Sequence, residues 1–153
     1  DALSAIEQAD VIILGPGSLY TSVIPNLLIK RISDAISSSH AYKVYVCNVM
    51  TQPGETDRYS ASEHLEAIVK HSRPDILNAC LMNSAEVTSA EALARYEREG
   101  SFPVVGDIEK VEAMGFEAVA KDLISVNDYV RHDSEKLTKE LITLIEKNRV
   151  IRR

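Results

Sequence analysis

Short apolar runs alternate with segments of helical spacing along the chain, and this alternation restricts the fold more than any other feature. The first run, residues 10–14, reads Asp-Val-Ile-Ile-Leu, which is typical of a strand covered on both faces of a sheet. Further strands are predicted at 43–47, 76–82 and 117–123. Strands that alternate with helices usually pair in parallel. The sequence therefore predicts an α/β fold with a mainly parallel sheet and helices on both sides.

Five segments place apolar residues on one helical face, namely 2–9, 27–38, about 60–71, 89–99 and 134–147. In the second of them the predicted core face is Leu28, Ile32, Ala35 and Ile36. Ser60 or Ser62 is the expected cap of the third. Segment 103–105 fits a short strand or a loop, and segment 108–114 fits no single period. A chain of 153 residues suits one domain, so we treat 1–153 as a single α/β unit.

The loop after the first predicted strand has the parts that an anion site needs. Its glycines allow tight turning and close approach of a ligand to the backbone, and the following helix offers free N–H groups. It matches neither GxGxxG nor a Walker loop. The alternative is an ordinary strand-to-helix turn whose hydroxyls cap the helix. The candidate phosphate-binding residues are Gly15, Gly17, Ser18, Leu19, Thr21 and Ser22.

A second polar loop follows the next predicted strand and would stand on the same rim of a parallel sheet, where ligands bind. Its side chains can donate to and accept from a base or a sugar. The alternative is a polar loop without a ligand. The candidate base- or sugar-binding residues are Asn48, Thr51, Gln52, Glu55 and Thr56.

Arg131 is the predicted charge contact, because its planar guanidinium matches phosphate oxygens. The alternative is a surface arginine beside Asp133. No Ser-His-Asp arrangement is evident, so the sequence assigns no catalytic residue.

Charge and cysteine content exclude several classes of function. Seventeen basic residues against 23 acidic ones give a net charge of −6, which argues against binding of a nucleic-acid duplex. Cys47 and Cys80 lie in apolar runs, as buried free thiols do, and neither CxxC nor HExxH occurs, so no metal site is predicted. No apolar run reaches the roughly 20 residues of a membrane span. These features predict a cytoplasmic address.

Segments 9–28 and 45–56 resemble the bacterial gluconeogenesis factor (YvcK) family, and 60–64 and 131–133 are similar to later segments of that family. This family belongs with the 2-phospho-L-lactate transferases (CofD), which share a Rossmann-like three-layer αβα core. The family's N-terminal half, with a Gly-Gly-Gly-Thr-Gly loop, has no counterpart in the sequence. We therefore expect an incomplete domain that corresponds to the C-terminal portion.

The resemblance implies a protein that binds UDP-sugars, notably UDP-N-acetylglucosamine, and acts on gluconeogenic growth, carbon partition to cell-wall precursors and cell shape. Loop 15–22 would hold the diphosphate, the Asn48 loop would meet the nucleoside or sugar, and Arg131 would add a charge contact. No cofactor is required, and a homodimer is expected for the full-length protein.

Two alternatives stay open. One is a CofD-like transferase that moves a phospholactyl group from a guanylyl-activated donor to a deazaflavin, with Mg²⁺. The other is an interaction module that keeps only the vestige of a ligand loop.

Overall fold

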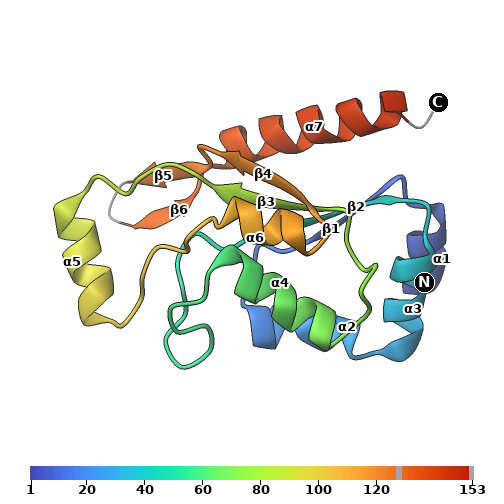
Figure 1. The fold of residues 1–153 in the computed structure, drawn as a ribbon, viewed down its shortest axis with the longest axis horizontal. Coiled ribbons are helices and arrows are strands. Elements are labelled where there is room, and N and C mark those ends of the chain that lie inside the picture. Colours follow the sequence, from blue (N-terminus) through green and yellow to red (C-terminus); the bar gives the residue numbers. More distant parts are fainter. Residues whose placement is uncertain (127–128, 152–153) are drawn as a thin grey trace.

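A computed structural model describes residues 1–126 and 129–151 of the protein. Its centre is a parallel sheet in which neighbouring strands follow chain order (Figure 1). The strands are β1 (Val11–Leu14), β2 (Tyr42–Val46), β3 (Ala79–Asn83) and β4 (Glu117–Lys121). An antiparallel pair, β5 (Ile124–Val126) and β6 (Val130–His132), follows β4. The predicted α/β fold with a mainly parallel sheet is confirmed.

Helices cover both faces of this sheet. One face carries a π-helical turn, η1 (Leu19–Val23), with α2 (Ile24–Leu27), α3 (Lys30–Ser38), α4 (Ala61–Lys70) and α6 (Ile108–Ala113). The other carries α7 (Ser134–Ile151) (Figure 1). The helix α1 (Ala2–Gln8) packs beside α3, and α5 (Ala90–Arg98) lies at the opposite end of the molecule.

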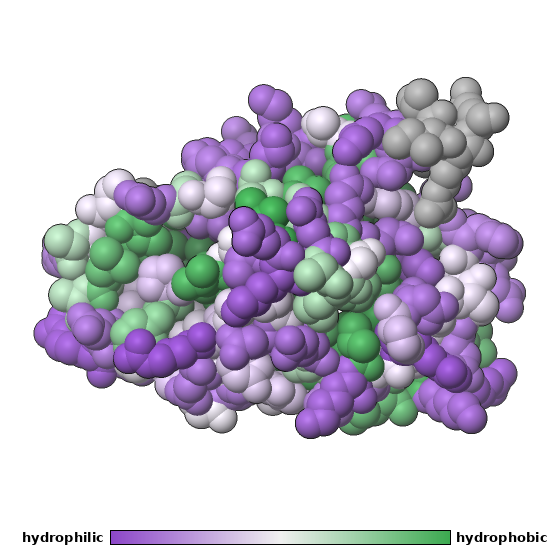
Figure 2. Space-filling view, viewed as in Figure 1, coloured by the Kyte–Doolittle hydropathy of each residue, from purple (hydrophilic) through white to green (hydrophobic). Residues whose placement is uncertain are grey.

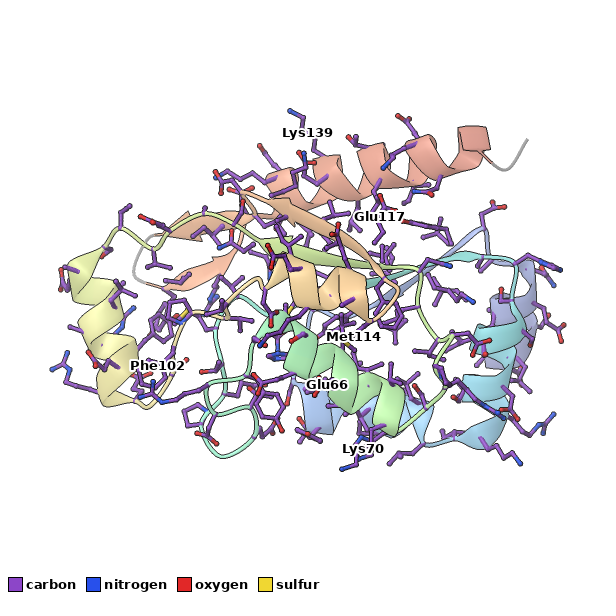
Figure 3. The ribbon with its side chains drawn as sticks, in the orientation of Figure 1. Glu66, Lys70, Phe102, Met114, Glu117 and Lys139 are labelled. Atoms are coloured by element: carbon purple, nitrogen blue, oxygen red, sulfur yellow. The ribbon has the colours of Figure 1, made fainter. Side chains whose placement is uncertain are left out.

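The alternation of side chains along β2 divides the core between the two helical layers. Tyr45 is fully buried toward the α4 side, whereas Tyr42 and Val44 pack toward α7. On α4, Glu66 and Lys70 lie on the outer side (Figure 3), away from its buried apolar residues.

The N-terminus of α4 is stabilised by a capping box. The Ser60 hydroxyl accepts a hydrogen bond from the Glu63 N–H, and the Glu63 carboxylate accepts one from the Ser60 N–H. Of the two predicted cap residues, Ser60 is therefore the cap.

Two predictions about the first βα unit are wrong in detail. The strand β1 is an edge strand and is not covered on both faces, since Ile13 is 46% exposed. The helix predicted over 27–38 is broken between α2 and α3, where Ile29 adopts an extended conformation. Leu28 falls at this break and is 61% exposed instead of facing the core. The uninterrupted apolar spacing conceals the break.

Polar side chains cover much of the surface seen in Figure 2, and apolar side chains gather at and beside α5. None of the described helices combines the length and the apolar character that crossing a membrane requires.

Candidate functional site

A hollow of about 520 Å³ lies beyond the carboxyl ends of β1 and β2, beside β6. We call it the rim pocket. Three separate stretches of chain form it: the loop after β1, the loop after β2, and β6. Its lining residues are Pro16, Gly17, Ser18, Asn48, Val49, Met50, Gln52, Val130, Arg131 and His132.

The rim pocket brings together five of the residues that the sequence singled out, namely Gly17, Ser18, Asn48, Gln52 and Arg131. They come from segments up to 114 positions apart, since Gly17 and Arg131 both line it (131 − 17). The shared rim predicted for the two loops is therefore present.

Other predicted residues lie away from this hollow. The Leu19 side chain is fully buried in the core, and Thr51 and Thr56 are buried as well. Thr21 and Ser22 are exposed but do not line the hollow. Gly15 and Glu55 also stand outside the lining.

The loop after β1 begins with a tight turn at Gly15. This residue has φ +79°, a left-handed conformation that favours glycine, and an added Cβ would meet the Val46 carbonyl oxygen at 2.8 Å. The Gly15–Pro16 peptide bond is cis. Gly17, in contrast, has room, because its nearest neighbour would be the Ser22 Cβ at 3.5 Å. The first glycine of this loop thus serves the turn itself.

Asn48 clamps the two loops together. The Gly17 N–H donates to the Asn48 Oδ1 at 3.1 Å, and the Asn48 Nδ2 donates back to the Gly17 carbonyl at 3.0 Å. Both ends of the amide are therefore engaged by the backbone of the first loop. Asn48 therefore sets the position of Gly17 and uses one donor and one acceptor site of its amide to do so.

Replacing Asn48 with alanine is expected to lower the free energy of unfolding by about 1–3 kcal/mol, because the Gly17 N–H and carbonyl lose their partner. Urea unfolding measures this change. Asn26→Ala is the control, since Asn26 is exposed in the nearby helix α2 and makes a single bond to the Ser22 carbonyl. Equal losses in the two variants would contradict the clamp.

A carboxylate stands beside the predicted phosphate loop. The Ser18 hydroxyl donates to the Glu55 Oε2 at 2.6 Å, and the Thr21 hydroxyl donates to the Ser18 Oγ at 2.6 Å. Both hydroxyls are thus used within the protein, and negative charge lies on this side of the pocket. The arrangement differs from a cradle made only of donors.

The two buried threonines shape the loop after β2. The Thr51 Oγ1 accepts from the Phe102 N–H at 2.9 Å, while the Thr56 Oγ1 accepts from the Gln52 N–H at 2.9 Å. These bonds hold the backbone on either side of Gln52 and leave its side chain in the wall of the rim pocket.

Arg131 lines the pocket from β6 and lies near a second arginine. The Arg131 and Arg95 guanidinium carbons stand 5.1 Å and 4.4 Å from the centroid of the Tyr129 ring. Neither arginine belongs to an ion pair within the part of the chain that the structure describes. Asp133, the predicted alternative partner, instead accepts from the N–H groups of Glu135 and Lys136 at the start of α7.

His132 is a lining residue to which the sequence assigned no role. Burial lowers the pKa of its imidazole, and a hydrogen bond to the Cys47 carbonyl opposes that shift, so the ring is neutral near pH 7. The sequence analysis predicted a ligand contact only for its neighbour Arg131, because of its charge. Because adjacent strand residues point to opposite faces, only the structure reveals that both line the pocket.

The described residues contain no cluster of three or more His, Cys, Asp or Glu side chains able to hold a metal ion. Cys47 and Cys80 are buried free thiols, as the sequence predicts.

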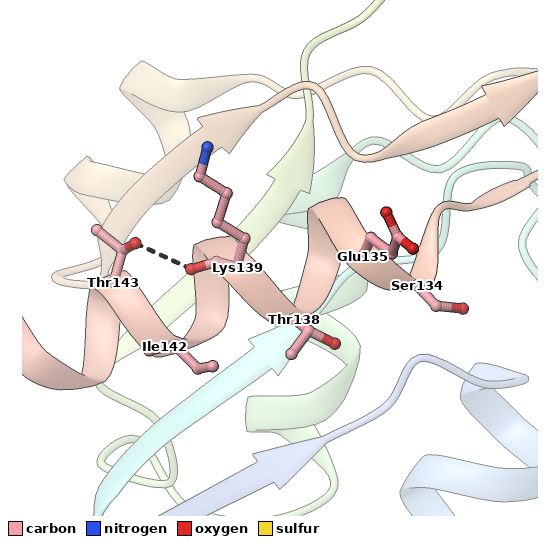
Figure 4. Close-up of a pocket in the computed structure, with 6 residues that line it drawn as sticks. All are labelled: Ser134, Glu135, Thr138, Lys139, Ile142 and Thr143. Atoms are coloured by element: carbon pink, nitrogen blue, oxygen red, sulfur yellow. Dashed lines mark hydrogen bonds between the residues drawn. The ribbon is translucent and has the colours of Figure 1, made fainter.

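Two further hollows contain none of the predicted site residues. One runs along α7 and is lined by Ser134, Glu135, Thr138, Lys139, Ile142 and Thr143 (Figure 4). The other lies between α5 and α6 and is mainly apolar, with Val87, Leu93 and Ile108 in its wall.

Comparisons with known proteins agree with this architecture. The family model described as 2-phospho-L-lactate transferase CofD matches residues 1–124. A Bacillus subtilis protein named gluconeogenesis factor is 42% identical over 147 residues, which cover 95% of this chain and 46% of that protein. A Halalkalibacterium halodurans protein of the same name is 44% identical over 143 residues, covering 93% and 44%. A crystal structure of a Bacillus halodurans protein has a TM-score of 0.87 at 44% identity, covering 92% of this chain and 45% of that one.

The chain spans about half the length of the curated relatives that it matches. The C-terminal portion expected from the sequence is not supported by these matches, which give only the length that is shared with each relative. The family assignment is independent of this point, because the family model covers most of the chain. The chain belongs to the CofD family, in which its relatives include the bacterial gluconeogenesis factors.

Proposed function

We propose that the protein binds a nucleotide sugar of the UDP-N-acetylglucosamine kind in the rim pocket. Through this binding it would regulate gluconeogenic growth, the partition of carbon to cell-wall precursors, and cell shape. The observation that carries the proposal is the convergence of two polar loops and Arg131 on one hollow. Its volume of about 520 Å³ falls within the range of roughly 300–1,000 Å³ typical of small-molecule sites.

The polar groups of the pocket favour binding over catalysis. Ser18 carries the one hydroxyl side chain among the lining residues, and it is hydrogen-bonded to Glu55 rather than to His132. Nucleophilic catalysis by serine normally needs a base within hydrogen-bond reach that is in turn oriented by a third group. Arg131 supplies positive charge suited to the phosphates.

Calorimetric titration with UDP-N-acetylglucosamine, UDP and GDP tests the proposal. The protein and the full-length Bacillus subtilis gluconeogenesis factor should both be titrated, since the chain matches about half of that relative. We expect saturable binding that prefers the UDP-sugar. If both proteins fail to bind all three ligands, the proposal is contradicted and an interaction module is favoured instead.

The second candidate is a CofD-like transferase, which the match to the CofD family favours. Such an enzyme would move a phospholactyl group from a guanylyl-activated donor to a deazaflavin. Mg²⁺ is commonly held by one or two carboxylates together with substrate phosphates, and Glu55 is the carboxylate that contacts the wall of the pocket through Ser18. A Mg²⁺-dependent transfer assay decides, and the absence of product would exclude this candidate.

We also propose that the protein is cytoplasmic and that the full-length protein forms a homodimer. Light scattering of the full-length protein checks the dimer, and a monomeric mass would contradict it.

A further inference from the structure

Two polar atoms in the wall of the rim pocket have no hydrogen-bond partner among the residues that the structure describes. They are the Gln52 Oε1 and the His132 Nε2, and both are buried. Buried polar atoms are nearly always paired, so two orphans in the wall of one hollow indicate that a bound molecule supplies the partners.

The chemistry of these atoms indicates what kind of group is missing. An amide oxygen only accepts. The other ring nitrogen of His132 donates to the Cys47 carbonyl, so the Nε2 of the neutral ring is an acceptor as well. A phosphate oxygen cannot donate when ionised and would leave the Gln52 oxygen unpaired. Two hydroxyls that each donate a proton would satisfy both atoms, and a sugar carries several hydroxyls. The Gln52 amide can turn toward the hollow about its last bond, because this terminal torsion is broad.

The charges around the pocket indicate where the diphosphate of a ligand would lie. Glu55 holds negative charge next to Ser18 on the loop side, whereas Arg131 and Arg95 flank Tyr129 on the β6 side and have no acidic partner among the described ion pairs. A diphosphate beside Glu55 would meet like charge, and beside Arg131 it meets opposite charge. Phosphate therefore belongs at β6.

We propose that the rim pocket binds its ligand in one orientation, with the diphosphate at Arg131 and the hydroxyls of the terminal sugar at Gln52 and His132. This inference rests on the proposed function and adds to it the residues that distinguish a nucleotide sugar from a nucleotide. Gln52 and His132 are thus specificity residues, whereas Arg131 contacts the part common to both ligands.

The test compares affinities for UDP-N-acetylglucosamine and UDP in two variants, Gln52→Leu and His132→Phe, by calorimetry. Each variant removes hydrogen-bonding capacity while keeping bulk. We expect each to weaken the UDP-sugar about tenfold, roughly the effect of one lost hydrogen bond, and to change UDP affinity less than twofold. His132→Gln restores a side chain that donates and accepts, and should recover part of the loss.

The outcomes separate the two proposals. If neither this protein nor the full-length relative binds either ligand, the proposed function fails. If the unmodified protein binds both ligands but the variants weaken UDP and the UDP-sugar equally, or weaken neither, the orientation fails while the proposed function stands. Gln52→Leu leaves the backbone bond from the Gln52 N–H to Thr56 in place, so this variant retains the local fold even if His132→Phe does not.

Discussion

Replacing Gly15 with alanine is expected to lower the free energy of unfolding by roughly 2–5 kcal/mol. Two costs add at this position. The φ of +79° is a conformation that residues with a Cβ rarely adopt, and the new Cβ would approach the Val46 carbonyl oxygen at 2.8 Å. Because that oxygen belongs to the backbone of β2, relief requires movement of the sheet. Urea unfolding followed by circular dichroism measures the loss.

Gly17→Ala is the matched control for this prediction. It lies two residues further along the same loop, its φ is not positive, and an added Cβ would make only an ordinary contact with Ser22. We expect a change within about 1 kcal/mol, the usual scale of a tolerated glycine substitution. Equal destabilisation by the alanine variants at Gly15 and Gly17 would contradict the distinction.

Removing Arg131 is expected to weaken a diphosphate ligand by about 1.5–3 kcal/mol, or roughly 10- to 150-fold in Kd. The guanidinium lines the rim pocket and has no carboxylate partner among the described ion pairs, so its charge is available to a ligand. Calorimetric titration of Arg131→Ala with UDP-N-acetylglucosamine and with UDP should show similar losses. Arg131→Lys should recover only part, because an ammonium lacks the planar fork.

Arg58→Ala is the control for the charge effect. Arg58 is exposed and stacks on the ring of Phe102 outside the rim pocket, so its removal changes the net charge equally. Its affinity for ligand should stay within twofold of the unmodified protein. Comparable weakening by both variants would mean that overall charge, and not a contact at Arg131, governs binding.

The fold was predictable because burial leaves a periodic mark on the sequence. The strands predicted at 10–14, 43–47, 76–82 and 117–123 correspond to β1 to β4, and the helix predicted over 134–147 corresponds to α7. Short edge strands and short interior strands have similar apolar sequences, so the sequence did not predict the exposure of Ile13. Segment 108–114, which fits no single period, holds the short α6, where Val111 is fully buried.

The convergence of the two loops was predictable, but the direction of each side chain was not. Position after a parallel strand was enough to bring Gly17 and Asn48 to one rim. The direction of a loop side chain depends on tertiary hydrogen bonds, which have no sequence period. For this reason Thr51 and Thr56 proved to be buried, and His132 was assigned no role.

The clamp between Gly17 and Asn48 has a consequence for how the protein folds. Its two residues are 31 positions apart and meet only where β1 and β2 run side by side. Closing that loop costs conformational entropy, and this loss precedes formation of the clamp. The clamp is therefore expected to form late in folding, after β1 and β2 have paired. The effect of the clamp would then be seen in the unfolding kinetics: Asn48→Ala should accelerate unfolding while leaving the refolding rate nearly unchanged.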